Sequence, residues 1–285
     1  MNKKVVNIVC IVLCVIAVLC IIFILVNTLV GKEENIKSEG QPVNETIVEE
    51  EQDGRQERGQ NVNVNSRIGL QLKELITYSE VYSNSIINEL DDYGLTNNAK
   101  LLIALDKISR KEEYQSYMQY SEEYNSTYIL PENMNTVLAA TFADTTITNR
   151  EITDVLSYDS STNSYIILPR GFANGVMEYT LEIPYKITEY ADRIELLAYR
   201  VYVTKNVQMQ DIETTVKNDL YYDKTKSVLI MSITDESVFN DSTQDEYLKT
   251  QIDNGAIDTA SLESVKYTFT KTDSQYRISN FENMK

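Results

Sequence analysis

The side chains that could do chemistry in this chain are limited by the residue types that it lacks. Its 285 residues include no histidine, and its three cysteines, Cys10, Cys14 and Cys20, all lie inside one apolar run. Without histidine there is no Ser-His-Asp triad, no Cys-His pair and no histidine-containing zinc site. Two carboxylates could still hydrolyse a glycoside. Because no carboxylate pair can be recognised in the sequence, we name no catalytic residue and expect a non-enzymatic protein.

One short motif has the alternating oxygen ligands of a calcium loop. Asp159, Ser161 and Asn163 have this spacing. However, the sixth position of the loop is Ser164 rather than Gly, and the twelfth is Arg170 rather than Glu. An Asx-type turn that starts a strand explains the same residues. We therefore expect no metal site and no cofactor.

A group of tyrosines is the candidate interaction face. If residues 111–125 are helical, at about 100° per residue, four tyrosines fall within an arc of about 120°. They are Tyr114, Tyr117, Tyr120 and Tyr124. Such a stripe could stack on a ligand or bind a partner. More often such a stripe packs on a sheet with its hydroxyls at the rim, and we favour that interpretation, with the interaction face as the alternative.

The net charge argues against one class of partner. The chain has 26 basic and 43 acidic residues, which gives a net charge of −17 at pH 7. Phosphate backbones and anionic lipid headgroups would be repelled by such a surface. We therefore expect no nucleic-acid binding.

The apolar run that contains the cysteines covers residues 5–30. As a helix it would be about 39 Å long, enough to cross a hydrocarbon core of about 30 Å. It is longer than the core of a cleaved signal peptide, and no A-x-A-type site follows it. We therefore favour an uncleaved transmembrane helix over a processed signal. The cysteines then serve as small apolar residues, with acylation or a crosslink as the alternative.

Charges on either side of this run predict its orientation. Lys3 and Lys4 precede it, whereas Lys32 is followed at once by two glutamates. By the positive-inside rule, residues 1–4 form a cytoplasmic tail and the rest of the chain is extracytoplasmic. We thus expect a single-pass protein of the cell membrane. The absence of His, Trp and exported Cys, with abundant Asn, Ile and Tyr, suggests a Gram-positive bacterium.

The chain behind the anchor divides into a tether and a folded domain. Residues 31–66 are polar, acidic and free of aromatic side chains, which predicts a disordered linker, either a simple tether or a binding segment. The folded domain is expected over residues 67–285. Its helices should lie at about 67–143 and its sheet at about 151–282.

Hydrophobic periodicity and capping residues predict the helices. Apolar residues three and four apart from Ile68 to Leu90 indicate one helix face, with Gly94 as its C-cap. Thr96 can cap a second helix, and Pro131 suits the first turn of a third.

After residue 144 the hydrophobic period changes to alternation, which predicts strands. One strand should have a single apolar face formed by Tyr179, Leu181, Ile183, Tyr185 and Ile187. Residues 193–204 form the return strand. Its alternation slips near Leu197, which indicates either a bulge or a strand covered on both faces.

The remaining alternating segments predict four more strands, at residues 164–168, 227–233, 264–270 and 275–281. The last two form a hairpin with Val265, Tyr267 and Phe269 facing inward. Residues 211–220 and 243–252 are expected to be short helical or irregular insertions.

Helices followed by an antiparallel meander predict an α+β domain with its N-terminal helices packed on a curved sheet. This order is similar to the cystatin/NTF2-like superfamily. Leu130-Pro131, Tyr158-Asp159, Tyr165-Ile-Ile-Leu-Pro169 and the hairpin at 179–203 also resemble segments of membrane-anchored or secreted clostridial proteins of uncharacterised function. These are turn and strand patterns, so the resemblance implies no functional residue.

We expect an extracytoplasmic interaction module that contacts the membrane through residues 5–30 and binds an envelope protein or peptide. A scaffold subunit of a conjugation- or sporulation-type envelope assembly is one alternative. A small-molecule pocket or enzyme in an NTF2-like sheet is another, and it predicts a deep pocket with a buried, convergent carboxylate pair.

Overall fold

The computed structural model of the chain describes residues 58–168, 175–210, 213–272 and 275–284. The expected cytoplasmic tail (1–4), the expected transmembrane helix (5–30) and the linker up to residue 57 lie outside the described residues. In the part that is described, no helix is both long and apolar enough to cross a bilayer. The described part is an α+β fold with antiparallel sheets.

Helices and strands are interleaved along the described chain. The described helices are α2 (Arg67–Ile76), α3 (Ser83–Tyr93), α4 (Asn97–Arg110), the 3-10 helix η1 (Glu112–Tyr117), α5 (Pro131–Thr141), α6 (Gln244–Asp253) and the 3-10 helix η2 (Thr259–Ser261). The described strands are β1 (Gln60–Val62), β2 (Met118–Ser121), β3 (Ser126–Ile129), β4 (Leu156–Asp159), β5 (Ser164–Ile167), β6 (Val176–Glu189), β7 (Arg193–Gln210), β8 (Glu213–Tyr221), β9 (Leu229–Ile233), β10 (Ser264–Thr272) and β11 (Gln275–Met284).

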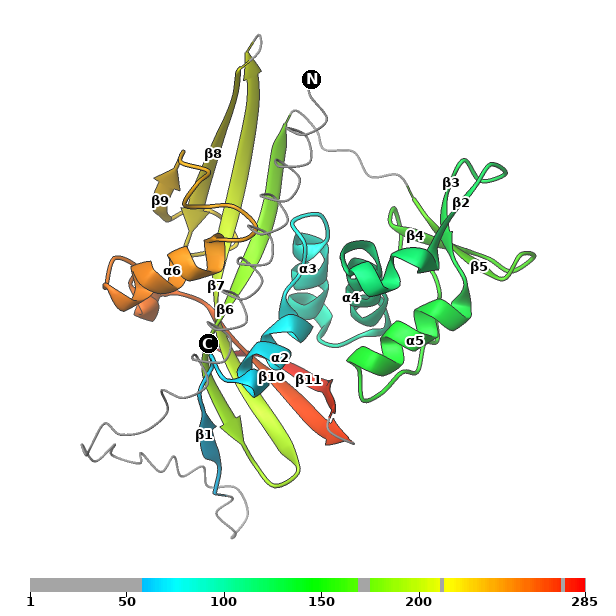
Figure 1. Cartoon of the computed structure of the whole chain (residues 1–285), viewed down its shortest axis with the longest axis horizontal. Coiled ribbons are helices and arrows are strands. Elements are labelled where there is room, and N and C mark those ends of the chain that lie inside the picture. Colours follow the sequence, from blue (N-terminus) through cyan, green and yellow to red (C-terminus); the bar gives the residue numbers. More distant parts are fainter. Residues whose placement is uncertain (1–57, 169–174, 211–212, 273–274, 285) are drawn as a thin grey trace, which may run out of the picture. The chain divides into compact units, whose positions relative to one another are not determined.

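The larger sheet is built around the long β6–β7 hairpin (Figure 1). Its described strands run in the order β1-β6-β7-β10-β11, with β8 pairing to β7 and β9 to β8. β7 is shared, since residues 193–199 pair with β10 and residues 202–210 pair with β8. Between them, the Arg200 N–H donates to the carbonyl of Glu263. The sheet is therefore forked at Arg200 rather than a simple meander.

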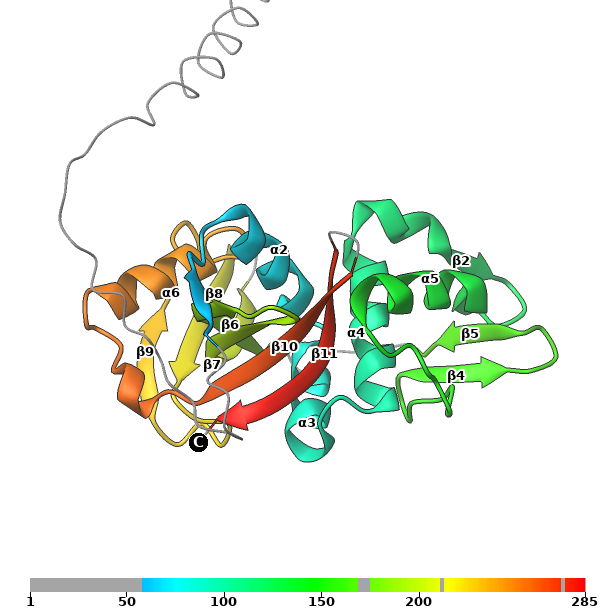
Figure 2. The ribbon, with the colours of Figure 1, turned by 90° about the horizontal axis from the view of Figure 1, so that it is seen from below.

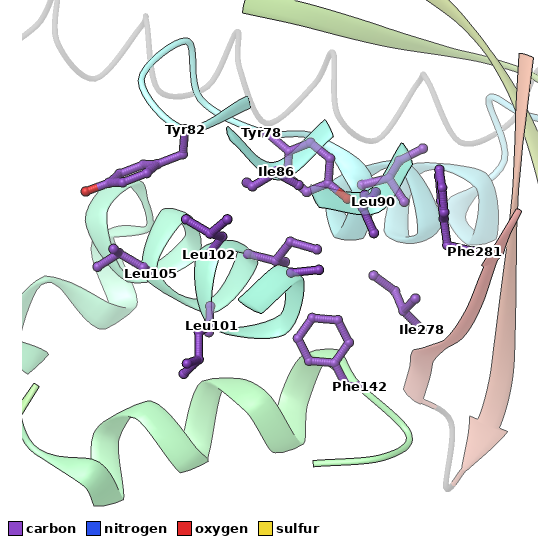
Figure 3. Close-up of a cluster of buried hydrophobic side chains, with 14 of the residues drawn as sticks. Tyr78, Tyr82, Ile86, Leu90, Leu101, Leu102, Leu105, Phe142, Ile278 and Phe281 are labelled. Atoms are coloured by element: carbon purple, nitrogen blue, oxygen red, sulfur yellow. The ribbon is translucent and has the colours of Figure 1, made fainter. Parts of the chain in front are cut away.

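Opposite faces of β7 pack against different cores. Leu196 and Ala198 belong to a large cluster with residues of α2, α3, α4 and α5, part of which is shown in Figure 3. Val201 and Val203 belong to a second cluster with residues of α6. Neighbouring residues of a strand point to opposite faces. Leu196 and Ala198 have even numbers and Val201 and Val203 have odd numbers, so the two pairs lie on opposite faces of β7. Double coverage of β7 is therefore observed near Leu197, and a bulge also lies opposite Leu197 in the partner strand β6.

A bulge in β6 corrects the predicted strand face. Ile183 pairs with Tyr199, whereas Ile187 pairs with Leu196, because the register shifts between Pro184 and Lys186. Tyr199 and Leu196 lie on opposite faces of β7. The prediction that the apolar residues from Tyr179 to Ile187 share one face is therefore wrong beyond the bulge.

The long N-terminal helix predicted from Ile68 to Leu90 is interrupted. α2 ends at Ile76, and α3 starts at Ser83. The Asp106 side chain of α4 is buried and accepts hydrogen bonds from the N–H of Ser79 at 2.9 Å and from its hydroxyl at 2.5 Å. This distant carboxylate stabilises a non-helical segment that the local pattern does not show.

Predictions that rest on capping residues are confirmed. α3 ends at Gly94, whose φ of 75° is the left-handed conformation that glycine adopts readily. The Thr96 hydroxyl accepts a hydrogen bond from the N–H of Ala99 at the start of α4. α5 begins at Pro131.

The described strands also form a second, four-stranded sheet with the order β2-β3-β5-β4 (Figure 2), and two of its strands, β2 and β3, lie in the predicted helical region. The β2–β3 hairpin replaces most of the helix considered for residues 111–125. Its turn includes Asn125 at a φ of 45°, which Asn tolerates better than most residues. At its far end, Ile129 is fully buried in the large cluster. Strand pairing and the burial of Ile129 therefore outweigh the helical spacing.

Strand pairing changes two further boundaries. Residues 213–221 form β8 rather than a helical or irregular insertion, because Val216 and Leu220 are buried while β8 extends the ladder of β7. Within the predicted linker, residues 60–62 form β1 and pair with β6. The other predicted strands and the helix at residues 243–252 are observed within a few residues, and Val265, Tyr267 and Phe269 are buried as expected.

Candidate functional site

The four candidate tyrosines do not share one face. Tyr114 and Tyr117 lie on η1, where their rings stack at 5.4 Å and pack against the large cluster. Tyr120 is exposed on β2, and its hydroxyl donates to Asn125. Tyr124 lies in the β2–β3 turn and donates to Asp159 at 2.7 Å. The structure brings together only the first pair, because the helix that would align all four ends at Tyr117.

The motif with calcium-like spacing is a turn between β4 and β5. Asp159 Oδ1 accepts hydrogen bonds from the Ser161 N–H at 2.8 Å and from its hydroxyl at 2.7 Å. This is the Asx-type arrangement, and that explanation of the motif is confirmed. Over the described ranges, no group of three or more acidic, cysteine or histidine side chains has a geometry that could hold a metal ion.

A buried charged network lies where the sheet forks. Arg200 is only 1% exposed, and its Nε donates to Glu182 Oε1 at 2.9 Å. Its Nη1 donates to Asp91 of α3. The Tyr267 hydroxyl donates to the second oxygen of Glu182 at 2.8 Å, and the Tyr78 hydroxyl lies 3.2 Å from that of Tyr267. Two carboxylates therefore converge inside the fold, but a guanidinium lies between them.

The network behaves as a structural unit. Burial raises the pKa of Glu182, and the positive charge of Arg200 acts against that rise. Burial also raises the pKa of Tyr267 well above its ordinary value, so this phenol remains a donor. Both oxygens of Glu182 are occupied by protein donors, which leaves no oxygen of this carboxylate directed at a substrate.

A second buried charge lies in α4, away from this network. Lys107 is 2% exposed, and its ammonium group donates to the carbonyl of Glu74 at 3.1 Å. Burial, assisted by the charge of Arg110, lowers the pKa of Lys107 to about 7. Its contacts stabilise the junction of α2 with α4.

An open groove of about 710 Å³, lined mostly by polar residues, lies beside the β7–β8 hairpin. Strand residues line one part, and the segment that follows β9 lines another. The lining residues are Asn206, Gln208, Thr214, Thr215, Val216, Lys217, Thr234, Asp235, Glu236 and Ser237. The groove has threonine hydroxyls, amides and charged groups, and it is the candidate binding site. We call it the β8 groove.

Polar contacts stabilise the chain around the β8 groove. Lys205 of β7 binds both oxygens of Glu80, at 3.0 and 3.1 Å. The Tyr179 hydroxyl of β6 donates to Gln244 of α6 at 3.3 Å. These contacts connect the sheet to the segment before α3 and to the helix that follows the groove wall. The strands beside the groove are thus tied to both of these segments.

Comparison with protein-family models, curated proteins and solved structures finds no match. The candidate site therefore depends on geometry alone.

Neither the network nor the groove is predicted by the sequence patterns. One usable signal was the hairpin register: Glu182 and Arg200 are at similar distances from the turn at Ala191-Asp192, so they pair. For the groove, Thr214, Thr215 and Val216 are three successive β-branched residues, typical of a strand. Their relation to residues 234–237 depends on where β9 ends, which no local pattern shows.

Proposed function

We propose that this chain is a non-enzymatic interaction module, anchored in the cell membrane by residues 5–30 and exposed on the extracytoplasmic side. Its folded domain binds another envelope protein or a peptide through the β8 groove. Residues 1–4 lie in the cytoplasm. The apolar run, the flanking charges and the cysteine-free remainder of the chain support this arrangement.

We also propose that the larger sheet and its N-terminal helices are a cystatin/NTF2-like variant. Three features support this assignment: helices precede the sheet in the chain, they cover one face of it, and β6 contains a bulge that curves such sheets. The fork at Arg200 and the second sheet are additions to that plan.

The observation on which the function rests is the contrast between interior and groove. In NTF2-like enzymes the chemistry would take place in the sheet concavity. Here the corresponding interior contains Tyr78, Tyr267 and the Arg200–Glu182 pair, all nearly inaccessible to solvent. The β8 groove, in contrast, is open and lined mostly by polar residues. Binding at the groove is therefore better supported than catalysis in the interior.

Two labelling experiments on the full chain test this proposal. Thr215→Cys places a thiol in the groove, and a membrane-impermeant maleimide should label it on intact cells. The matched variant Asn2→Cys should be labelled only after lysis. The opposite pattern would refute the orientation.

The interaction itself is tested by a photo-crosslinking amino acid at Thr215. It should give discrete adducts with envelope proteins, whereas the same amino acid at exposed Thr145, outside the groove, should not. Equal adducts at both positions, or none at Thr215, would refute the interaction module.

A further inference from the structure

One edge of β8 has backbone groups with no described partner. The Val207 N–H donates to the carbonyl of Gly175, on the β6 side of β7. In an antiparallel ladder, the residue opposite Val207 is then in a non-hydrogen-bonded pair and directs its own backbone groups away from β7. That residue is Val216, and Thr214 has the same parity.

The strand that could cover this edge ends too early. β9 pairs with β8 from Asn218 to Tyr221, and its last residue, Ile233, lies opposite Asn218. The chain then forms a wall of the β8 groove instead of continuing along β8. The outward N–H and C=O groups of Thr214 and Val216 therefore face the groove without a partner among the described residues.

Two other edges of the same sheet are protected. On β6, the N–H of Thr180 donates to the buried hydroxyl of Ser83 at 3.0 Å. On β11, the carbonyl of Ile278 accepts from the N–H of Ala143 at 2.9 Å. Native proteins commonly cover sheet edges in this way. The β8 edge differs because it opens into a groove.

The charges of the groove limit what could bind there. Lys217 is already paired with Asp219 at 2.9 Å. Asp235 and Glu236 line the wall, and neither has an ion pair with another described residue. The uncompensated charges of the described groove are therefore negative.

We propose that the β8 groove binds an extended peptide segment of another protein, which adds to the sheet as a strand beside residues 213–217. This inference rests on the proposed function and specifies its partner. The added strand occupies the row that β9 leaves, over about 16 Å at about 3.3 Å per residue. Main-chain hydrogen bonds to Thr214 and Val216 supply affinity, as in other cases of strand addition. Lysine or arginine side chains of the segment lie near Asp235 and Glu236.

Proline substitution distinguishes the two edges of β8. Thr214→Pro removes an outward N–H and should leave the urea midpoint of unfolding unchanged, because the β7 ladder does not use that group. Thr215→Pro removes an inward N–H opposite Gln208 and should lower the midpoint. If both variants unfolded alike, the assignment of the edge would be wrong.

Binding is tested with the full chain in lipid nanodiscs and a phage-displayed library of random decapeptides. Peptides enriched on the wild-type chain should contain lysine or arginine and alternate polar with β-branched residues. Thr214→Pro should weaken the binding of these peptides about tenfold or more, since it removes a backbone donor and places a proline ring at the edge of β8. The double variant Asp235→Asn, Glu236→Gln should also weaken peptide binding and should make that binding less dependent on salt concentration.

The outcomes separate this inference from the proposed function. No enrichment, or enriched peptides that bind Thr214→Pro as well as the wild type, would overturn strand addition. If crosslinks at Thr215 persisted unchanged in Thr214→Pro, the interaction module would stand and strand addition would fall. If no crosslinks formed at all, both would fall.

Discussion

Replacing Arg200 by methionine should be strongly destabilising, although the substitution adds apolar surface to the interior. Arg200 is 1% exposed, and the Glu182 side chain beside it is 2% exposed. Methionine keeps an unbranched apolar stem but ends short of the guanidinium, so the substitution removes the charge, all of its donors and the contact with the Phe281 ring. Glu182 would then be a buried carboxylate whose remaining donor is the Tyr267 hydroxyl at 2.8 Å.

Removing one partner of a buried ion pair costs about 3–5 kcal/mol of unfolding free energy. The lower end, about 3 kcal/mol, applies here because Tyr267 still donates to Glu182 and the 14%-exposed Asp91 can turn towards water. For a domain of this size, about 3 kcal/mol corresponds to a fall in Tm of about 6–12 °C. Replacing both Arg200 and Glu182 by methionine should recover most of the loss, because no buried charge is then left unpaired.

The pH dependence gives an independent check. Burial raises the pKa of Glu182 in the folded wild-type protein, and loss of Arg200 should raise it further. A carboxyl group with a raised folded pKa binds more protons in the folded than in the unfolded state. Its contribution to stability is therefore present at low pH and lost as the pH rises through the folded pKa. The free energy of unfolding of Arg200→Met should be closest to that of the wild type near pH 5 and furthest below it near pH 7.

Urea unfolding followed by tyrosine fluorescence measures these differences, since the chain has 20 tyrosines and no tryptophan. The variants Arg200→Met, Glu182→Met and the double variant form a complete cycle with the wild type. A loss below about 1 kcal/mol in Arg200→Met would refute the reasoning. So would a double variant less stable than Arg200→Met.

Two further predictions concern other buried groups. Ser83→Ala should remove the acceptor of the Thr180 N–H and lower the free energy of unfolding by about 1–3 kcal/mol, whereas Ser83→Thr should retain the acceptor. Urea unfolding and amide exchange at Thr180 measure this effect, and equal urea midpoints for Ser83→Ala and the wild type would contradict it. The lowered pKa of Lys107, about 7, means that the unfolded state binds more protons above that pH, so wild-type stability should rise towards pH 10. Lys107→Met should lack this rise when the free energy of unfolding is measured against pH. Identical pH profiles for the variant and the wild type would contradict the prediction.

Local features of the fold were predictable because short segments encode them. Gly94, Thr96 and Pro131 mark helix ends through backbone conformation and capping, which involve only neighbouring residues. The β10–β11 hairpin follows from alternation, since a strand with one buried face must repeat every two residues. The cystatin/NTF2-like assignment and the function remain predictions.

The candidate site was less predictable because its parts are far apart in sequence. The tyrosine spacing between Tyr114 and Tyr124 fits a helix, but pairing of β2 with β3 and of β3 with β5, together with burial of Ile129, decides otherwise. The groove joins residues of β7 and β8 with residues 234–237. Its shape depends on the point at which β9 leaves β8.

The sequence by itself determined the composition that limits the chemistry: no histidine, cysteines confined to residues 5–30, and a net charge of −17. It also determined the helix ends and the alternating strands. Only the tertiary structure decided that β7 is shared between two strands and packs on opposite faces, and that Asp106 interrupts the first helix from 27 residues away. These features arise from long-range pairing and burial, whose free energies exceed the local preferences that a sequence pattern reports.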